Sequence, residues 1–346
     1  MEVPATTIAI VPHEKFSLMR RSLESVLANT PEPHRIVVVD GGSHRSVAGY
    51  LTDQARRHDF TLVRTDYFLR PNEARNLGLR YSRTEFVAFV DNDVVVDPGW
   101  LAPLERCARE TGAAVVSPLC CIGAREHASV HLTRGECRIV ESGGRRVMHE
   151  RFLDGGRSLD DVLPDVERVQ CELVDAHVLL VRSAALADGG LDEEIRTEEH
   201  IDLALTIRAR GGTLWLEPES IVTYITPRHL PPSDLPFYVA RWSEAWSRST
   251  LTHLAEKWRL SSDDPWLVEK AQWVSAHRLG CYYGYYTVPA PLRRLSRRWH
   301  RVIRVITDRV AQRVAVRHYT KQREKHDGPR VVHAASWLRE PAEVRV

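Results

Sequence analysis

The sequence predicts an α/β fold: a mostly parallel sheet flanked by helices, with a helical extension towards the C-terminal end. Short β-branched runs alternate with longer mixed segments over residues 6–116, as in successive βαβ units. After the prolines at 231, 232 and 236, aromatic helical segments replace this pattern. The 346 residues, 43% hydrophobic and 27% charged, are typical of a globular chain large enough for one big α/β domain and an appendage.

Five apolar runs predict strands that helices cover on both faces: residues 7–11, 35–39, 60–64, 86–90 and 113–117. Apolar residues at helical spacing between Phe16 and Leu27 predict a helix, and Pro71 introduces another over residues 73–80. Residues 119–170 lack sustained periodicity and are interpreted as loops and short strands inserted over the sheet. Further strands are predicted at 173–181, 214–216 and 221–225, and a helix at 202–210.

We expect a main domain over residues 1–230, with halves 1–118 and 119–230, followed by the extension 231–346. The extension ends in a helix whose apolar stripe includes Trp299, Ile303, Ile306 and Val310, while arginines lie mainly elsewhere on the helix. Packing or a homodimer contact through this helix is favoured over peripheral binding to an anionic membrane, and nucleic acid is not an expected partner.

No apolar run approaches the length of a membrane-spanning helix, and residues 1–11 lack the features of a secretory signal. The expected location is therefore the cytoplasm, with the inner face of the membrane as the alternative. The six cysteines include no Cys-x-x-Cys pair and are interpreted as free thiols.

The sharpest chemical feature is the run Asp91-Asn92-Asp93, which directly follows the strand predicted at 86–90. Ligands of open α/β sheets gather at the carboxyl ends of strands. Neighbouring carboxylates repel one another, and Mg²⁺ or Mn²⁺ bridging them to a diphosphate would remove that repulsion. The alternative is that these acids cap a helix or lie solvated in a turn.

Two other segments point to the same edge. Asp40 ends the second predicted strand as Asp91 ends the fourth, so the two strand ends would form a cleft. Arg75 carries a forked guanidinium that suits phosphate oxygens, although it could instead pair with Glu73 or Asp97 at the surface.

These segments resemble the family 2 glycosyltransferases, which have the GT-A fold. The resemblance lies in Asp40-Gly41-Gly42-Ser43, in 74–78 (Ala-Arg-Asn-Leu-Gly) and in Asp91-Asn92-Asp93, within the first 120 residues. A second acidic block, 198–203, is similar to the acceptor-side motif of that family and extends the resemblance to about residue 226.

The resemblance implies a nucleoside diphosphate sugar as donor, bound mainly by residues 1–118, and inversion at the anomeric carbon. It implies an acceptor hydroxyl on a glycan, a lipid-linked or a small molecule. It assigns Mn²⁺ or Mg²⁺ to Asp93 and Asp91. The donor-binding residues implied are Pro12, Asp40, Arg75, Asn76, Asp91 and Asn92.

Inversion needs a general base, and three residues are candidates: Glu199, Asp202 and His200. Glu199 is the first choice because a carboxylate is favoured at a helix start. Asp202 lies one turn further on the same face, and His200 has a reference pKa of about 6.5, near working pH.

The third metal ligand of the family is often a histidine, for which His229 is the nearest candidate, although Tyr224 lies closer to the matching position. His131 and His177 are expected to be structural or to contact the acceptor.

Two other functions remain open. A phosphatase with Asp91 as nucleophile would carry a similar Asp-x-Asp run after an apolar strand. A protein of the same fold could also bind a nucleotide or glycan without turnover, because His200 stands where the family commonly has an acid.

Overall fold

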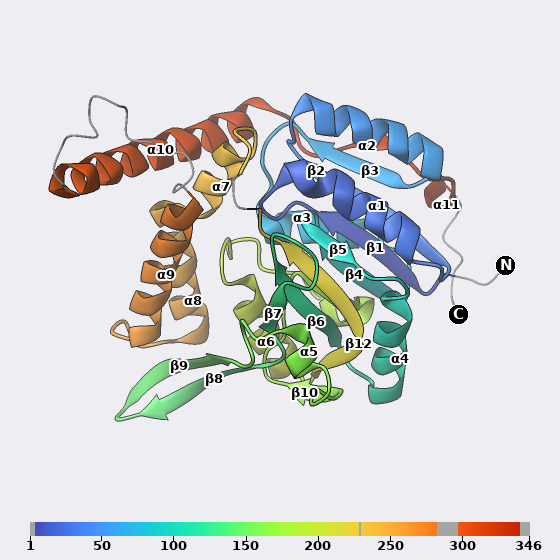
Figure 1. The fold of residues 1–346 in the computed structure, drawn as a ribbon, viewed down its shortest axis with the longest axis horizontal. Helices are drawn as coiled ribbons and strands as arrows, with labels where there is room; N and C mark the ends of the chain where they lie inside the picture. Colours follow the sequence, from blue (N-terminus) through green and yellow to red (C-terminus); the bar gives the residue numbers. More distant parts are fainter. Residues whose placement is uncertain (1–3, 228–229, 282–296, 340–346) are drawn as a thin grey trace.

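The computed structural model describes residues 4–227, 230–281 and 297–339 and contains an eleven-stranded mixed sheet (Figure 1). The strands follow one another across the sheet in the order β10-β12-β6-β11-β4-β1-β2-β3-β13, and β5 and β7 pair outside this path with β12 and β6. Strands β1, β2, β3 and β4 are parallel, as are β6 and β12. The predicted fold class, an α/β sheet flanked by helices, is confirmed.

The first part of the chain alternates strands and helices as the sequence pattern predicts. Its strands are β1 (Thr6–Val11), β2 (His34–Gly41), β3 (Thr61–Thr65), β4 (Phe86–Asp91) and β5 (Val94–Val96). Its helices are the 3₁₀ turn η1 (Phe16–Leu18), α1 (Met19–Asn29), α2 (Arg45–His58), α3 (Pro71–Arg80) and α4 (Leu101–Thr111).

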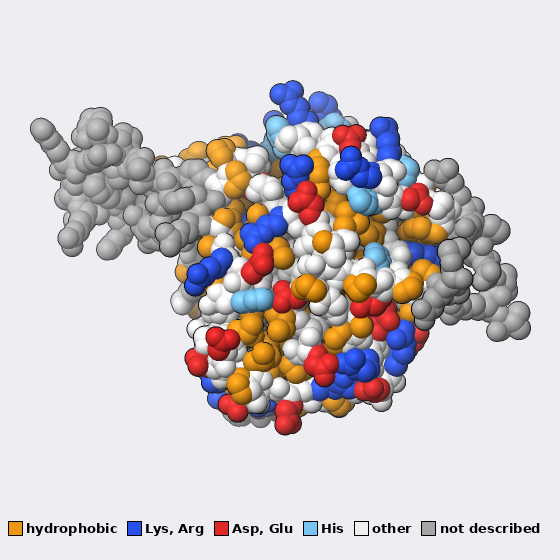
Figure 2. Space-filling model, turned by 45° about the vertical axis from the view of Figure 1, so that its right-hand side comes forward, with side chains coloured by type: hydrophobic (Ala, Val, Ile, Leu, Met, Phe, Trp, Pro, Cys, Tyr) orange, Lys and Arg blue, Asp and Glu red, His pale blue; other side chains and the backbone are white. Residues whose placement is uncertain are grey.

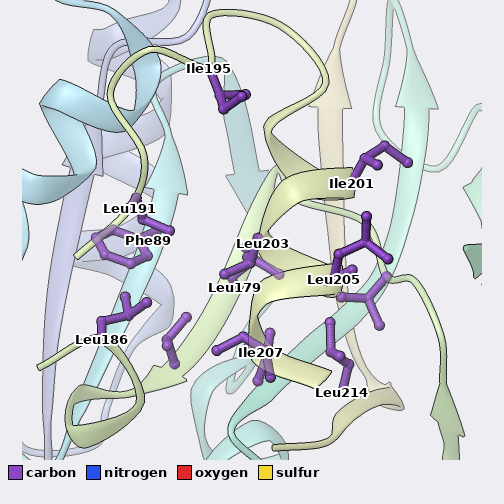
Figure 3. Close-up of a cluster of buried hydrophobic side chains, with 14 of the residues drawn as sticks. Phe89, Leu179, Leu186, Leu191, Ile195, Ile201, Leu203, Leu205, Ile207 and Leu214 are labelled. Carbon is purple, nitrogen blue, oxygen red and sulfur yellow. The ribbon is translucent and has the colours of Figure 1, made fainter. Parts of the chain in front are cut away.

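Alternate residues of the central strands face two separate hydrophobic layers, since successive side chains of a strand point to opposite faces. Ile8, Ile10 and Phe86 pack under α1, α2 and α4. Ala9 and Phe89 pack under α3 and α6 (Glu199–Ala209). Figure 3 shows the second layer, with the leucines and isoleucines of α6 lying against Phe89 and neighbouring side chains. Both faces of the sheet are therefore covered, which leaves the strand ends to bind ligands.

The middle of the chain adds strands to the sheet and an excursion away from it. In chain order the elements are β6 (Val115–Gly123), β7 (Ser129–Leu132), β8 (Gly135–Ser142), β9 (Arg145–Phe152), α5 (Leu159–Val162), β10 (Val169–Cys171), β11 (Val178–Arg182), η2 (Ser183–Leu186), α6 and β12 (Leu214–Ile225). Strands β8 and β9 form a separate hairpin around Gly143 and Gly144, whose φ values of 58° and 75° fit a two-residue turn.

The remaining elements are mainly helical: α7 (Leu235–Arg241), α8 (Glu244–Trp258), α9 (Pro265–Cys281), α10 (Arg297–Lys325), β13 (Arg330–His333) and α11 (Ser336–Arg339). A buried ion pair joins α9 to α10: Arg278 Nε and Nη2 each lie 3.0 Å from an oxygen of Asp308. Arg323 on α10 donates to Glu73 Oε2 on α3 at 2.8 Å. The long helix is thus anchored at both its middle and its end.

Several boundaries differ from those predicted. The strand expected at 173–181 begins only at Val178, because Asp175 Oδ1 accepts the backbone N–H of His177 at 2.8 Å and turns the chain before the strand. The strands expected at 214–216 and 221–225 form one strand, β12, whose register shifts between Glu217 and Ile221. Strand β13, which pairs with β3, was not predicted in the extension.

The apolar stripe predicted on the last helix was expected to pack or to form a homodimer contact. Ile306 and Val310 are 57% and 52% exposed, so packing of these two residues within the chain is wrong, while the homodimer contact stays a prediction. The packed face instead consists of Asp308, Gln312, Ala315 and Tyr319. Among the described residues, no helix is both long and apolar enough to cross a bilayer.

Candidate active site

Asp91, Asn92 and Asp93 lie at the carboxyl end of β4 and the turn into β5, and all three are at most 2% exposed. Val11 O, at the end of β1, accepts the backbone N–H of Asn92 at 2.9 Å. The Asn92 side chain in turn accepts the backbone N–H of His13 at 2.9 Å. These bonds fix the turn against the segment that follows β1.

Residues 13–15 surround the Asp93 carboxylate. Lys15 Nζ lies 3.1 Å from Asp93 Oδ2 and 2.7 Å from Glu14 Oε2. His13 Nδ1 lies 3.4 Å from Asp93 Oδ2. Tyr224 on β12 completes the cluster, because its hydroxyl donates to Glu14 Oε2 at 2.6 Å and accepts from Lys15 Nζ at 2.6 Å.

The charges of this cluster balance one another. Burial alone would raise the pKa of Asp93, but Lys15 and His13 outweigh it, and the pKa of Asp93 is lowered. Burial likewise opposes ionisation of Glu14, but Lys15 holds the pKa of Glu14 well below its usual range. Despite its own burial, the pKa of Lys15 is raised by Asp93 and Glu14. Asp93 and Glu14 are therefore ionised at neutral pH around a buried ammonium group.

Arg75, predicted to bind the donor, lies beside the same turn. Its Nη2 is 3.1 Å from Asp91 Oδ1, and its side chain is only 5% exposed. The surface pairing of Arg75 with Glu73 or Asp97 is therefore wrong. Burial nevertheless raises the pKa of Asp91, although His13 and Arg75 act in the opposite direction.

Asp40 is held at the end of β2 by partners of its own. It forms an ion pair with Arg64 Nη1 and accepts the backbone N–H and the hydroxyl of Ser43, each at 3.0 Å. The chain approaches Pro12 closely here, since a Cβ on Gly41 would lie 3.1 Å from Pro12 Cγ. Burial raises the pKa of Asp40 despite Arg64.

Asn76 faces a different part of the molecule. Its amide donates to Leu191 O at 2.8 Å, and its oxygen accepts the Leu191 N–H at 2.8 Å. The side chain thus fixes the loop that leads into α6, and no described bond joins it to Asp91 or Asp93.

Glu199 begins α6 and reaches the site from the other side. Arg241 Nη1, at the end of α7, donates to Glu199 Oε1 at 2.9 Å. Glu199 lines a small cavity together with Arg75 and His200. Burial would raise the pKa of Glu199, but Arg241 and then Arg75 outweigh it, so the pKa is lowered. The carboxylate is ionised at neutral pH and can accept a proton.

The two other candidate bases have different surroundings. Burial lowers the pKa of His200 to about 4, and its Nε2 lies 4.0 Å from Glu150 Oε1. Asp202 accepts from Lys257 Nζ at 2.8 Å and from Trp258 Nε1 at 2.9 Å. Both oxygens of Asp202 are therefore engaged by α8, whereas Glu199 has one oxygen outside its ion pair.

The residues around Asp93 fit a divalent metal ion. Ligand atoms of His13, Glu14 and Asp93 lie within 4.8 Å of one another, as do those of His13, Asp91 and His177. Asp93 Oδ1 is buried and has no hydrogen-bond partner among the described residues. Burying a carboxylate oxygen without a partner is costly, and a cation would remove that cost.

The other predicted histidines have identifiable partners. His177 stacks on Tyr224 with ring centroids 4.1 Å apart, and its Nδ1 lies 2.8 Å from Asp175 Oδ1. His131 Nδ1 bonds the other oxygen of Asp175. His229 lies outside the described residues.

Several site residues were not predicted: His13, Glu14, Lys15, Arg241, Trp242 and His277. The last two contribute from the C-terminal helices, since Trp242 Nε1 donates to Glu14 Oε1 at 2.8 Å and His277 Nε2 lies 3.6 Å from that atom. Asp40 and Asp91 were predicted as site residues because each stands at the carboxyl end of a strand. The same reasoning applies to residues 13–15, because they follow the first strand. No comparable sequence signal marks Trp242 or Arg241.

The sheet, its covering helices and the acidic strand end together define a GT-A-like α/β fold. A solved structure described as GalNAc-T7 with UDP, GalNAc and Mn²⁺ has the same fold, with a TM-score of 0.50 and 17% identity over 80% of this chain and 58% of that one.

Residues 7–154 match the family described as Glycosyl transferase family 2. A pre-mycofactocin glycosyltransferase of Mycobacterium tuberculosis is 31% identical over 220 residues, which are 63% of this chain and 42% of the relative. A validoxylamine A glucosyltransferase of Streptomyces hygroscopicus subsp. limoneus is 25% identical over 63% of this chain and 51% of the relative. The chain thus spans about half the length or less of these relatives. Its N-terminal part is similar to members of glycosyl transferase family 2.

Proposed function

We propose that this chain transfers a glycosyl group from a nucleoside diphosphate sugar to an acceptor hydroxyl, with inversion and with Mn²⁺ or Mg²⁺. The observation that carries the proposal is the cluster at the end of β4. Among the described residues, the buried Asp93 Oδ1 accepts no hydrogen bond, although His13 Nδ1 lies 3.4 Å away. Glu14 lies beside it, and Arg75 contacts the neighbouring Asp91.

Asp93, with Asp91, would hold the metal ion, and His13 and Glu14 supply further ligand atoms within reach. A divalent ion there supplies positive charge for the departing diphosphate. Arg75 offers nitrogen donors at the same strand end, and Asp40, Asn92 and Pro12 complete the proposed donor site. Asn76, predicted for this site, is instead bound to Leu191. The related fold solved with UDP, GalNAc and Mn²⁺ supports this choice of ligands.

We assign the general base to Glu199. An inverting transfer needs a group that is ionised before reaction and takes the proton of the acceptor hydroxyl as it attacks. Glu199 meets the first requirement through Arg241. His200 is neutral at pH 7 but poorly basic, since its pKa is about 4, and Asp202 is bound on both oxygens.

The experiment compares wild type, Asp93→Asn and Glu199→Gln with a panel of nucleoside diphosphate sugars and Mn²⁺. Nucleotide release is followed with and without acceptor alcohols. We expect Asp93→Asn to lose metal-dependent nucleotide binding and turnover together. Glu199→Gln should keep nucleotide binding, measured by thermal shift, and lose at least about 100-fold in transfer, the usual scale of a general base.

Exposed Glu219→Gln is the matched control and should behave as wild type. Binding without turnover in the wild type for every donor would instead support the non-catalytic alternative. The phosphatase alternative has less support, because residues 7–154 match Glycosyl transferase family 2 and Asp91 is paired with Arg75.

A further inference from the structure

Helix α10 has two opposite faces with different surroundings. Asp308, Gln312, Ala315 and Tyr319 form the buried face, and α7 is its main neighbour in the fold. The opposite face carries an exposed apolar row: Val302, Val305, Ile306, Val310 and Val314, which are 40%, 43%, 57%, 52% and 62% exposed. A continuous apolar row on one side of a surface helix is unusual unless something covers it.

Arginines flank this row. Arg309, Arg313 and Arg317 are all exposed and follow one another at the same four-residue spacing as Ile306, Val310 and Val314. Residues spaced by four lie on one side of a helix. Over residues 297–323 the only carboxylate is Asp308, which is buried against Arg278. Up to Arg323, the exposed side of α10 therefore carries positive charge without an acid of its own, and Glu324 follows near the end of the helix.

The basic surface continues onto α8. Arg248 lines a groove of about 450 Å³ together with Arg309, Arg313 and Arg317, and Glu244 is the one acid in its lining. Arg248 and Glu244 also border a larger groove of about 1140 Å³ between α8 and α9, whose lining includes Leu251, Leu267 and Val268. By contrast, acidic and basic side chains are interspersed over most of the face shown in Figure 2.

We propose that this face docks on the surface of a bilayer containing anionic phospholipids. The apolar row enters the boundary between headgroups and acyl chains, and the arginines contact lipid phosphates. Helices that lie in the plane of a membrane surface combine an apolar row with flanking Lys or Arg in this way. A second copy of the chain fits less well, because two such faces would bring four groove arginines of each copy together with only Glu244 of each copy to pair with them.

The test is vesicle sedimentation of the full chain with phosphatidylcholine vesicles and with vesicles that also contain phosphatidylglycerol. We expect binding only to the second kind, and release as salt is raised. Each basic residue near an anionic surface contributes roughly fivefold to partitioning, so R309Q/R313Q/R317Q should weaken binding about 100-fold. The variant I306S/V310S/V314S should also weaken it, with little change in salt dependence.

R45Q/R56Q/R57Q is the charge-matched control, since these arginines are exposed on α2, and it should bind as the wild type does. Circular dichroism and donor hydrolysis without vesicles check that each variant is folded. Equal loss in the α2 variant would reveal nonspecific charge attraction and overturn the proposal. Absence of vesicle binding, with a wild-type dimer that the serine variant dissociates, would assign the face to a homodimer contact instead.

Discussion

Replacing Arg241 by Met tests the assignment of Glu199 as the base. Arg241 is 2% exposed and donates to Glu199 Oε1 at 2.9 Å, so the substitution leaves a buried carboxylate without its main partner. Removing one member of a buried ion pair costs about 3–5 kcal/mol. The change should therefore be visible in both stability and pH dependence.

The neighbouring Glu198 indicates the direction of the effect. It is also buried, its only described ion-pair partner is Lys270 at 3.5 Å, and burial raises its pKa to about 7. Without Arg241, burial should likewise raise the pKa of Glu199, although Arg75 still acts against this rise.

The direction with pH follows from linkage. In the wild type the lowered pKa of Glu199 contributes stability above pH 4.5 that is lost as the pH falls through the folded-state value. In Arg241→Met the pKa of Glu199 is raised, so ionised Glu199 destabilises the folded state instead of stabilising it. The stability loss relative to the wild type is therefore largest at neutral and higher pH and becomes smaller as the pH falls towards 4.5. The acid limb of the transfer rate, which lies below pH 4.5 in the wild type, should move to higher pH in Arg241→Met.

The assay is transfer rate and urea unfolding as a function of pH for wild type, Arg241→Met and Arg241→Lys. The lysine variant keeps the charge and should retain most of the wild-type profile. An unchanged acid limb in Arg241→Met, together with a stability loss of the expected size, would show that Glu199 is paired with Arg241 but is not the base.

Three other predictions concern the metal site and the packing of α10. Lys15→Met should unfold at lower temperature than the wild type without metal, because Asp93 and Glu14 lose their common cation. Mn²⁺ should raise the Tm of this variant more than the Tm of the wild type. An equal Tm shift in both proteins would argue against metal binding at Asp93. Chelation of divalent ions should abolish transfer and added Mn²⁺ should restore it, measured by nucleotide release; undiminished turnover in chelator would refute metal dependence. Asp308→Ala should cost about 3–5 kcal/mol in urea unfolding by removing the main carboxylate partner of the buried Arg278. Exposed Arg317→Ala should change stability by less than about 0.5 kcal/mol.

The sequence was informative wherever one local rule decides the structure. The apolar runs predicted β1, β2, β3 and β4, because strands covered on both faces need apolar residues throughout. The acidic residues at the end of β4 predicted a binding site at this strand end, and in the structure Arg75 contacts Asp91 there. In β12 the local rule failed, since Glu217, Pro218 and Glu219 interrupt the apolar pattern while the strand continues through a register shift.

Long-range pairing could not be predicted in the same way. Strand β13 is four residues long, largely exposed, and exists through its pairing with β3. Arg278 binds Asp308 and so turns that side of α10 towards the rest of the chain. Ile306 and Val310 are therefore on the outward side of the helix. Neither local pattern nor propensity contains that information, because a buried ion pair between α9 and α10 overrides the hydrophobic stripe.

The C-terminal helices contribute to the charge balance of the site itself. Trp242 donates to Glu14, which shares Lys15 with Asp93, and Arg241 holds Glu199 ionised. Both the proposed metal site and the proposed base thus depend on the end of α7. Arg278 fixes that end by donating to Trp242 O, and Arg278 is itself bound to Asp308 on α10. Because the same α10 carries the proposed membrane face on its other side, docking would act on a helix that is linked to Glu14 by three successive contacts, through Arg278 and Trp242.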